Sequence, residues 1–123
     1  MDRLVDLDAV AAELRARRGG WEARGLQVGA FTWRDAHASW PQPIVTGRAS
    51  VVDPESLGLT MDAGPDRFAG LVLWCGGWAD LDCLIGDQIL SETPHYSNTA
   101  ECVAVAERLA DRLLSGTREP QET

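Results

Sequence analysis

The sequence predicts an α+β fold, in which an antiparallel five-stranded meander carries the N- and C-terminal helices on one of its faces. Amphipathic segments with helical spacing lie near the two ends of the chain. Between them, short runs of strand composition alternate with turns rich in glycine and proline. We expect residues 1–116 to form a single α+β domain and residues 117–123 to form a flexible C-terminal tail.

The first helix is predicted over about residues 6–24, with Asp6 as its N-cap. Two consecutive glycines inside this range cost roughly 1 kcal/mol each. They do not end the helix in this interpretation, because Trp21 continues the apolar stripe beyond them. Gly25 followed by Leu26 is typical of a Schellman ending, in which a left-handed glycine terminates the helix.

Five segments between the helices have strand composition. They are residues 26–34, 48–52, 68–75, 78–85 and 88–92. In the first of them, Phe31 and Trp33 alternate with polar residues, as in a strand with one buried face. The two long connections, predicted as loops from their glycines, prolines and a histidine, are residues 35–47 and 53–66. The last helix follows the cap Asn98, and Glu101 completes a pattern like a capping box.

Gly76-Gly77 is predicted to be a two-residue hairpin turn, since the favoured turn needs positive φ at both positions. A turn of this length fixes the register of the two strands. It places Trp74 on an uncharged face that we expect to meet the helices. The other face mixes aromatic, aliphatic and acidic side chains, namely Leu71, Leu73, Trp78, Asp80 and Asp82.

The chain is acidic, with nineteen acids, eleven bases (all of them arginine) and a formal net charge of −8. Such a charge is repelled by nucleic acid and by anionic membranes, and it complements a basic protein partner. The alternative is that the charge only keeps the protein soluble. The N-terminal residues lack the pattern of a signal peptide, and no apolar run reaches the ~18–20 residues of a membrane span. We expect a cytoplasmic protein.

Candidate catalytic and metal-binding residues are few. The cysteines lie in apolar patterns without CxxC spacing, which favours buried thiols in a reducing compartment; they are Cys75, Cys83 and Cys102. His37 and His95 are isolated, so no metal site is predicted. Asp80 and Asp82 share a strand face, but a flat sheet face is a poor pocket for catalysis. We predict no enzymatic activity, no catalytic residue and no cofactor.

One stretch of the chain resembles a known family. LVLWCGGWADLDCLI, a short strand ending in Ser-Glu and the helical segment AVAERLADRLL resemble small bacterial immunity proteins of the TriTu type. Those proteins accompany polymorphic Rhs toxins that ADP-ribosylate elongation factor Tu. In that family a strand ends in tryptophan, a glycine turn follows, and the next strand carries an acidic-apolar-acidic run. The matching residues here are Leu73, Trp74, Gly77, Asp80, Leu81 and Asp82.

The resemblance covers residues 5–25 and 68–114, and it implies a stoichiometric inhibitor. Such a protein would bind and neutralise a cognate toxin domain, an ADP-ribosyltransferase, by occluding it as a monomer or weak dimer. We expect the partner-binding residues to be Trp40, Trp78, Asp80, Asp82, Asp87, Asp62 and Asp66.

Three alternatives stay open from the residues alone. The first is a secretion chaperone or adaptor module that binds a basic protein partner. The second is a small-molecule or enzyme domain with a deep pocket on a curved sheet. The third is that Trp78 is half-buried under the 53–66 connection and that the acids near it are simply solvated.

Overall fold

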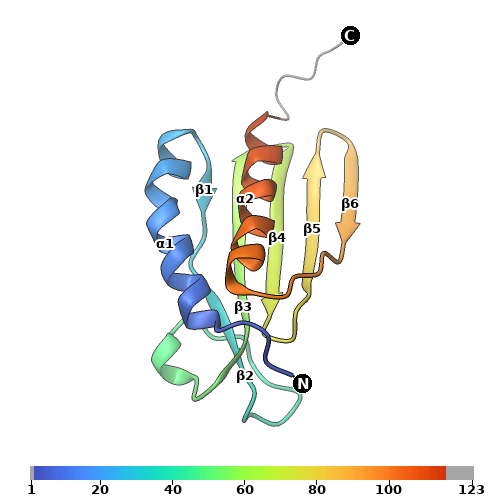
Figure 1. Ribbon diagram of the computed structural model, residues 1–123. Helices are drawn as coiled ribbons and strands as arrows, with labels where there is room; N and C mark the ends of the chain where they lie inside the picture. The colour runs from blue at the N-terminus through green and yellow to red at the C-terminus, as the bar shows by residue number, and fades with distance from the viewer. Residues whose placement is uncertain (1, 116–123) are drawn as a thin grey trace.

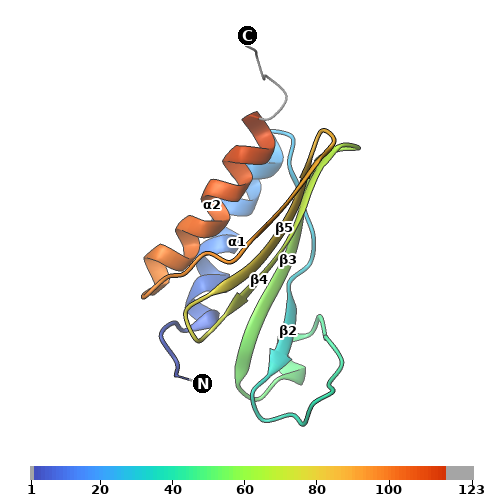
Figure 2. The same cartoon turned by 90° about the vertical axis from the view of Figure 1, so that its right-hand side faces the viewer.

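Two helices lie side by side on one face of an antiparallel sheet (Figure 1), and Figure 2 shows that neither lies on the opposite face. This computed structural model describes residues 2–115, so the predicted tail at 117–123 lies outside the part described. The predicted α+β fold is confirmed. Its elements are α1 (Leu7–Ala23), β1 (Gln27–Val28), β2 (Thr32–Asp35), the 3-10 turn η1 (Arg48–Ser50), β3 (Pro54–Gly64), β4 (Arg67–Trp74), β5 (Ala79–Ile85), β6 (Gln88–Glu92) and α2 (Thr99–Ser115).

The sheet is a meander of six strands rather than five. From β3 to β6 each strand pairs with the next one along the chain, and both β1 and β2 pair with β3. The predicted strand 26–34 is split because its register against β3 changes. Val28 lies opposite Met61, and Thr32 lies opposite Gly58. The chain from 28 to 32 thus advances four positions, whereas β3 advances only three positions between the same pairs. The extra residue interrupts the ladder and divides the strand.

The longest strand is one that the sequence did not predict. Residues 53–66, predicted as a loop, contain the 11-residue strand β3, and residues 48–52, predicted as a strand, contain the turn η1. The glycines of β3 obscure a regular alternation, and Pro54 stands at its first position, where a strand tolerates proline. The side chains that β3 turns toward the helices are Leu57, Leu59 and Met61.

Both ends of α1 form as their sequence predicts. The Asp6 carboxylate accepts hydrogen bonds from the backbone N–H groups of the second and third helical residues, at 2.9 and 3.4 Å. At the other end, Gly25 has φ +100° and donates to Glu22, while Leu26 donates to Trp21 at 3.1 Å, which is the Schellman pattern. In the described part of the chain, no helix has both the length and the apolar character required to cross a membrane.

The core lies between the helices and the inner faces of the central strands. α2 begins at its cap Asn98, whose side chain accepts from the Glu101 N–H at 2.8 Å. The three cysteines are buried, as predicted, and no disulfide joins them. The largest fully buried side chains include Trp33, Leu14, Leu57, Leu71, Leu73, Leu109 and Leu113.

The β4–β5 hairpin differs from the prediction by one residue. Its loop holds the three residues 75–77, and the Trp74 N–H donates to the Trp78 carbonyl at 2.9 Å. Val72 therefore lies opposite Asp80. The prediction that Trp74 meets the helices is wrong: Val72 and Trp74 lie on the same face of the sheet as Asp80, away from the core.

The physical reason is the environment of the loop. Gly77 has φ +106°, and a Cβ at this position would lie 2.9 Å from the Tyr96 carbonyl oxygen and 2.7 Å from the Leu4 side chain. Segments distant in sequence therefore set the conformation of the loop, and the sequence of the turn alone does not predict it. As a consequence, Leu71 and Leu73, predicted on the face with the acids, are buried in the core.

This assignment of faces predicts unequal costs for removing two tryptophans. Trp33 is 1% exposed, so we expect Trp33→Ala to lower the free energy of unfolding by about 3–5 kcal/mol. Trp74 is half-buried on the outer face, and Trp74→Ala should cost clearly less. Chemical denaturation of the two variants measures the difference. Equal losses would contradict the register described above.

Candidate protein-binding site

We call the face of the sheet that points away from α1 and α2 the open face. Figure 2 shows that the loop 36–53 borders it at its lower end, beside β2. The strand registers determine which side chains it carries. They are Thr32, Arg34, Ser56, Gly58, Thr60, Asp62, Phe68, Gly70, Val72, Trp74, Asp80, Asp82, Leu84, Ile89 and Ser91.

The lower part of the open face carries stacked aromatic rings with an arginine between two of them. The indoles of Trp74 and Trp78 stack with their centroids 6.0 Å apart and their planes 19° apart. The Arg34 guanidinium lies 5.3 Å from the Trp74 ring and 6.0 Å from the Trp40 ring. We call these four side chains the tryptophan ladder. Cation–π contacts contribute about 0.5–1 kcal/mol at exposed sites, so Arg34 helps to position Trp40, which is 60% exposed.

A buried tyrosine supports the ladder from within the protein. The Tyr96 hydroxyl lies 2.7 Å from the Trp74 carbonyl oxygen and 2.6 Å from that of Trp78, and these two acceptors share its single O–H proton. Burial raises the pKa of Tyr96 well above its ordinary value, so the phenol keeps its proton. Burial also raises the pKa of the neighbouring Cys102 thiol to about 12. Tyr96 therefore holds the backbones of both stacked tryptophans at a fixed separation.

Two carboxylates of the open face lack basic partners. Asp80 accepts from the Trp74 indole N–H at 2.9 Å, and Asp82 accepts from the Ser91 hydroxyl at 2.6 Å. Within residues 2–115, neither carboxylate takes part in an ion pair. Both side chains are exposed. A neutral donor fixes the position of each carboxylate without neutralising its charge.

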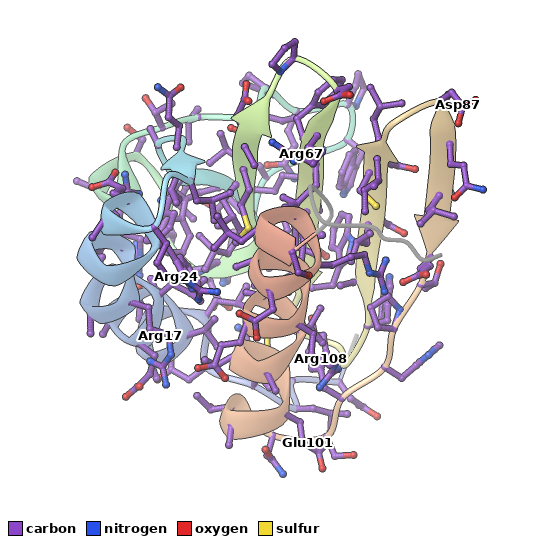
Figure 3. The ribbon with its side chains drawn as sticks, turned by 90° about the horizontal axis from the view of Figure 1, so that it is seen from above. Arg17, Arg24, Arg67, Asp87, Glu101 and Arg108 are labelled. Atoms are coloured by element: carbon purple, nitrogen blue, oxygen red, sulfur yellow. The ribbon has the colours of Figure 1, made fainter. Side chains whose placement is uncertain are left out.

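Charges on the helix side are arranged differently. Arg17 lies on α1 and Arg24 caps its C-terminal end, both beside α2 (Figure 3), and each pairs with an acid of that helix. Arg17 lies 2.7 Å from Glu107, and Arg24 lies 3.3 Å from Asp111. The acids that remain available to an external cation are thus concentrated on the sheet side rather than between the helices.

The middle of the open face is hollowed on both sides of Gly70. One hollow, of about 230 Å³, extends toward β2 and is lined by residues that include Thr32, Gly58, Thr60, Val72 and Asp80. The other, of about 290 Å³, extends toward β6 and is lined by Phe68, Gly70, Asp82, Cys83, Leu84 and Ile89. Phe68 is 46% exposed and Ile89 is 77% exposed. Apolar surface of this kind on an uncovered sheet face is typical of an interaction site.

The structure divides the predicted site residues into two groups. Trp78, Asp80 and Asp82 lie together on the open face, and Trp40 reaches it from the loop 36–53. The other group lies toward the far end of the sheet, with Asp66 and Asp87 in its turns and Asp62 near the end of β3. β4 spans this separation in seven steps, or roughly 23 Å.

That second group is Asp62, Asp66 and Asp87. The two turns that carry Asp66 and Asp87 are adjacent, because the Gly86 N–H donates to the Asp66 carbonyl at 2.8 Å. Figure 3 shows Asp87 at this turn, at the outer edge of the sheet. Asp62 lies near the end of β3 and accepts from the Gly64 N–H at 2.9 Å, just before the turn that carries Asp66. These three acids therefore do not form one cluster with the tryptophans.

Several residues of the site were not predicted. Arg34 and Tyr96 belong to segments distant from the hairpin, and their contacts exist only in the folded chain. Trp74 was assigned to the core by the predicted register. Phe68 and Ile89 are large apolar residues at exposed strand positions. Phe68 belongs to the alternation of β4, whereas the burial pattern of β6 gives no such signal for Ile89.

The loop that carries Trp40 is anchored to the rest of the molecule at both ends. The Asp35 carboxylate accepts from three backbone N–H groups at the ends of the loop, and these bonds, led by that from Val52, hold the pKa of Asp35 below its ordinary value. Arg48 bonds both oxygens of Asp8, at 2.7 and 2.9 Å, and lies over the Trp33 ring at 5.6 Å. Trp40 is thus presented by a fixed loop.

The histidines lie apart from the open-face acids. His37 Nε2 lies 3.4 Å from the Asp53 carboxylate in the loop, and His95 forms an isolated bridge with Trp78. Within the part of the chain that the structure describes, no three histidine, cysteine or acidic side chains are grouped so that they could hold a metal ion.

Removing the hydroxyl of Tyr96 tests its support of the ladder. We expect Tyr96→Phe to lower the free energy of unfolding by about 1–2 kcal/mol, because the ring stays while the hydrogen bond shared between the Trp74 and Trp78 carbonyls is lost. Denaturation measures this loss, and near-UV circular dichroism reports the stacked indoles. An unchanged stability together with an unchanged spectrum would show that the hydroxyl does not position the ladder.

The Asp8–Arg48 pair predicts a pH dependence. The hydrogen bond from Arg48 is the main cause that holds the pKa of Asp8 below its ordinary value of 3.8. A lowered folded-state pKa gives stability that is present above 3.8 and is lost as the pH falls through the lower value. We expect Asp8→Asn to cost less than about 1 kcal/mol at pH 7, since the pair is exposed. The cost should vanish near pH 2, and thermal unfolding at both pH values checks it.

Comparison of the chain with protein-family models, curated proteins and solved structures found no match in any of the three. The geometry of the open face is therefore the basis for the function proposed next. That geometry consists of the tryptophan ladder, two carboxylates without basic partners and the apolar hollow beside them.

Proposed function

We propose that this protein is a binding protein that uses its open face to dock a basic protein partner. The observation that carries the proposal is the juxtaposition of the tryptophan ladder with Asp80 and Asp82 on a face that no helix of the described chain covers. Tryptophan and arginine are the side chains most often found at energetic centres of interfaces. Exposed acids select a basic partner and accelerate its association.

We further propose that the partner is a toxin domain that the protein neutralises by covering it. The resemblance of LVLWCGGWADLDCLI to TriTu-type immunity proteins supports this proposal, and it implies an ADP-ribosyltransferase as the target. Inhibition by occlusion needs an interface of only about 800 Å² on each partner. The ladder is held in place by Tyr96 and by the anchored loop, and such preorganisation lowers the entropic cost of binding.

A binding role is favoured over catalysis by the composition of the open face. The hollows beside Gly70 are mostly apolar, and the polar side chains that line them are two carboxylates and, in the hollow toward β2, two threonines. A catalytic site would need convergent acid, base or nucleophilic groups around a reacting atom. Neutralisation in the cytoplasm is compatible with three buried cysteines that no disulfide joins.

A secretion chaperone or adaptor is the second candidate. The observation that favours it is the edge strand β6, which pairs only with β5 within residues 2–115. An uncovered edge offers backbone groups for pairing with a second chain. Sedimentation of the purified protein separates the two candidates, because a stable dimer without any partner supports the chaperone, whereas a monomer or weak dimer supports the inhibitor.

Growth rescue tests the inhibitor directly. We expect the gene beside this one to encode a large secreted protein with a C-terminal toxin domain. Production of that domain in bacterial cells should arrest growth, and co-production of this protein should restore growth. A neighbouring toxin domain that this protein neither binds nor neutralises would contradict the proposal.

Charge reversal locates the surface. The double change Asp80→Lys and Asp82→Lys should slow association with the toxin domain at least tenfold, because steering is reversed, while the fold is kept. The matched control is Glu22→Lys with Asp111→Lys, which changes the net charge equally on the helix side. Surface plasmon resonance measures both association rates. Equal slowing by the two pairs would show that only the overall charge matters.

A further inference from the structure

Gly70 occupies a position that its own fold does not require to be glycine. It lies in the middle of β4, and its φ is not among the positive values found at other glycines. A Cβ built at Gly70 would meet no atom within 4 Å, whereas one at Gly58 would collide with the Thr32 side chain. Glycine weakens a strand interior and often marks a close approach by another molecule. The glycine here leaves open space on the surface of the sheet.

The space above Gly70 has apolar walls and an acidic rim. Phe68 and Leu84 lie opposite each other on neighbouring strands, and Ile89 extends the wall on β6. Asp82 lies directly opposite Gly70 in the β4–β5 register. Asp80, two residues earlier on the same face, lines the adjoining hollow, about 6–7 Å away along the strand. A group in this space would therefore meet aliphatic and aromatic carbon on one side and carboxylate oxygen on the other.

Among residues 2–115, no basic side chain forms an ion pair with the carboxylates at this position. Asp80 and Asp82 each accept a hydrogen bond from a neutral donor, the Trp74 indole and the Ser91 hydroxyl. Arg34, the basic residue that the strand registers place on the open face, is committed to the Ser56 hydroxyl and to two tryptophan rings. Two fixed carboxylates with remaining acceptor capacity are complementary to a planar, bidentate cation.

We infer that the hollow at Gly70 is a socket for an arginine side chain of the partner protein. The inference rests on the proposed function and specifies the chemistry of its central contact. An arginine has an aliphatic stem that packs on apolar surface and a guanidinium with five donors that can bond two carboxylates. A second copy of this chain is disfavoured as the occupant, because two molecules of net charge −8 repel each other.

A peptide titration tests the socket without knowledge of the partner. The ¹⁵N-labelled protein is titrated with acetyl-Gly-Ile-Arg-Ile-Gly-amide, and the amide signals of Gly70, Asp82 and Leu84 are followed by NMR. We expect saturable shifts of these signals, with affinity at least fivefold weaker when glutamine or lysine replaces the peptide arginine. Absence of these shifts, or equal binding of the glutamine or lysine peptide, would overturn the inference.

Filling the socket provides the sharpest variant. Gly70→Val should keep or raise the melting temperature, because β-branched residues suit a strand and nothing crowds the new side chain. The substitution should weaken the binding of the arginine peptide at least tenfold. Asp82→Asn should also weaken the binding of this peptide. This variant serves as the second test if Gly70→Val is poorly folded. Asp111→Asn, on the helix side, is the charge-matched control and should bind as the unaltered protein does.

Further outcomes separate this inference from the proposed function. Unchanged peptide binding by Gly70→Val would overturn the socket, and so would concentration-dependent shifts of the same amides without peptide, which would identify a second copy as the occupant. Full rescue by Gly70→Val, combined with loss of rescue by the Asp80→Lys and Asp82→Lys pair, would overturn the socket and leave the proposed function standing. If both variants rescued fully, the proposed function would fail as well.

Discussion

The register of the β4–β5 hairpin is the constraint on which the rest of this structure depends. Three distant segments meet at its loop. All three bonds join backbone N–H groups to backbone carbonyls. Leu4 donates to Cys75 at 2.8 Å, Cys75 donates to Glu55 at 3.0 Å, and Tyr96 donates to Gly77 at 2.9 Å. Because side chains alternate along a strand, a change of one residue in pairing would bring different residues of the two strands into contact. The hairpin thus depends on tertiary contacts for the arrangement of its side chains.

The fixed register separates stability from recognition. On the helix side, Leu71, Leu73 and Leu81 pack in the core and supply hydrophobic stabilisation. On the open side, the same two strands present Trp74 and Asp80, joined by a hydrogen bond of 2.9 Å. Substitutions on the open face need not disturb the core. A surface of this kind is free to adapt to a partner while the fold that carries it is kept.

Rigidity and openness are combined on the open face. The aromatic rings are ordered by stacking, by Arg34 and by the Tyr96 hydroxyl beneath them, so little conformational freedom is left to lose on binding. Gly70 leaves space at the centre of the face, and Asp82 keeps its charge there. Ordered rings at the rim and open space in the middle are consistent with the binding role proposed above.

The sequence by itself determined the features that depend on near neighbours: the caps of both helices, the α+β class, the burial of the cysteines and the alternation that turns Asp80 and Asp82 outward. These follow from contacts within a few residues. Only the tertiary structure decided that residues 54–64 form a long inner strand despite their glycines and proline. It also decided that Trp74 faces outward and that the Arg34 guanidinium lies over its ring. The reason is that strand pairing and register are long-range properties, fixed by partners far along the chain rather than by local composition.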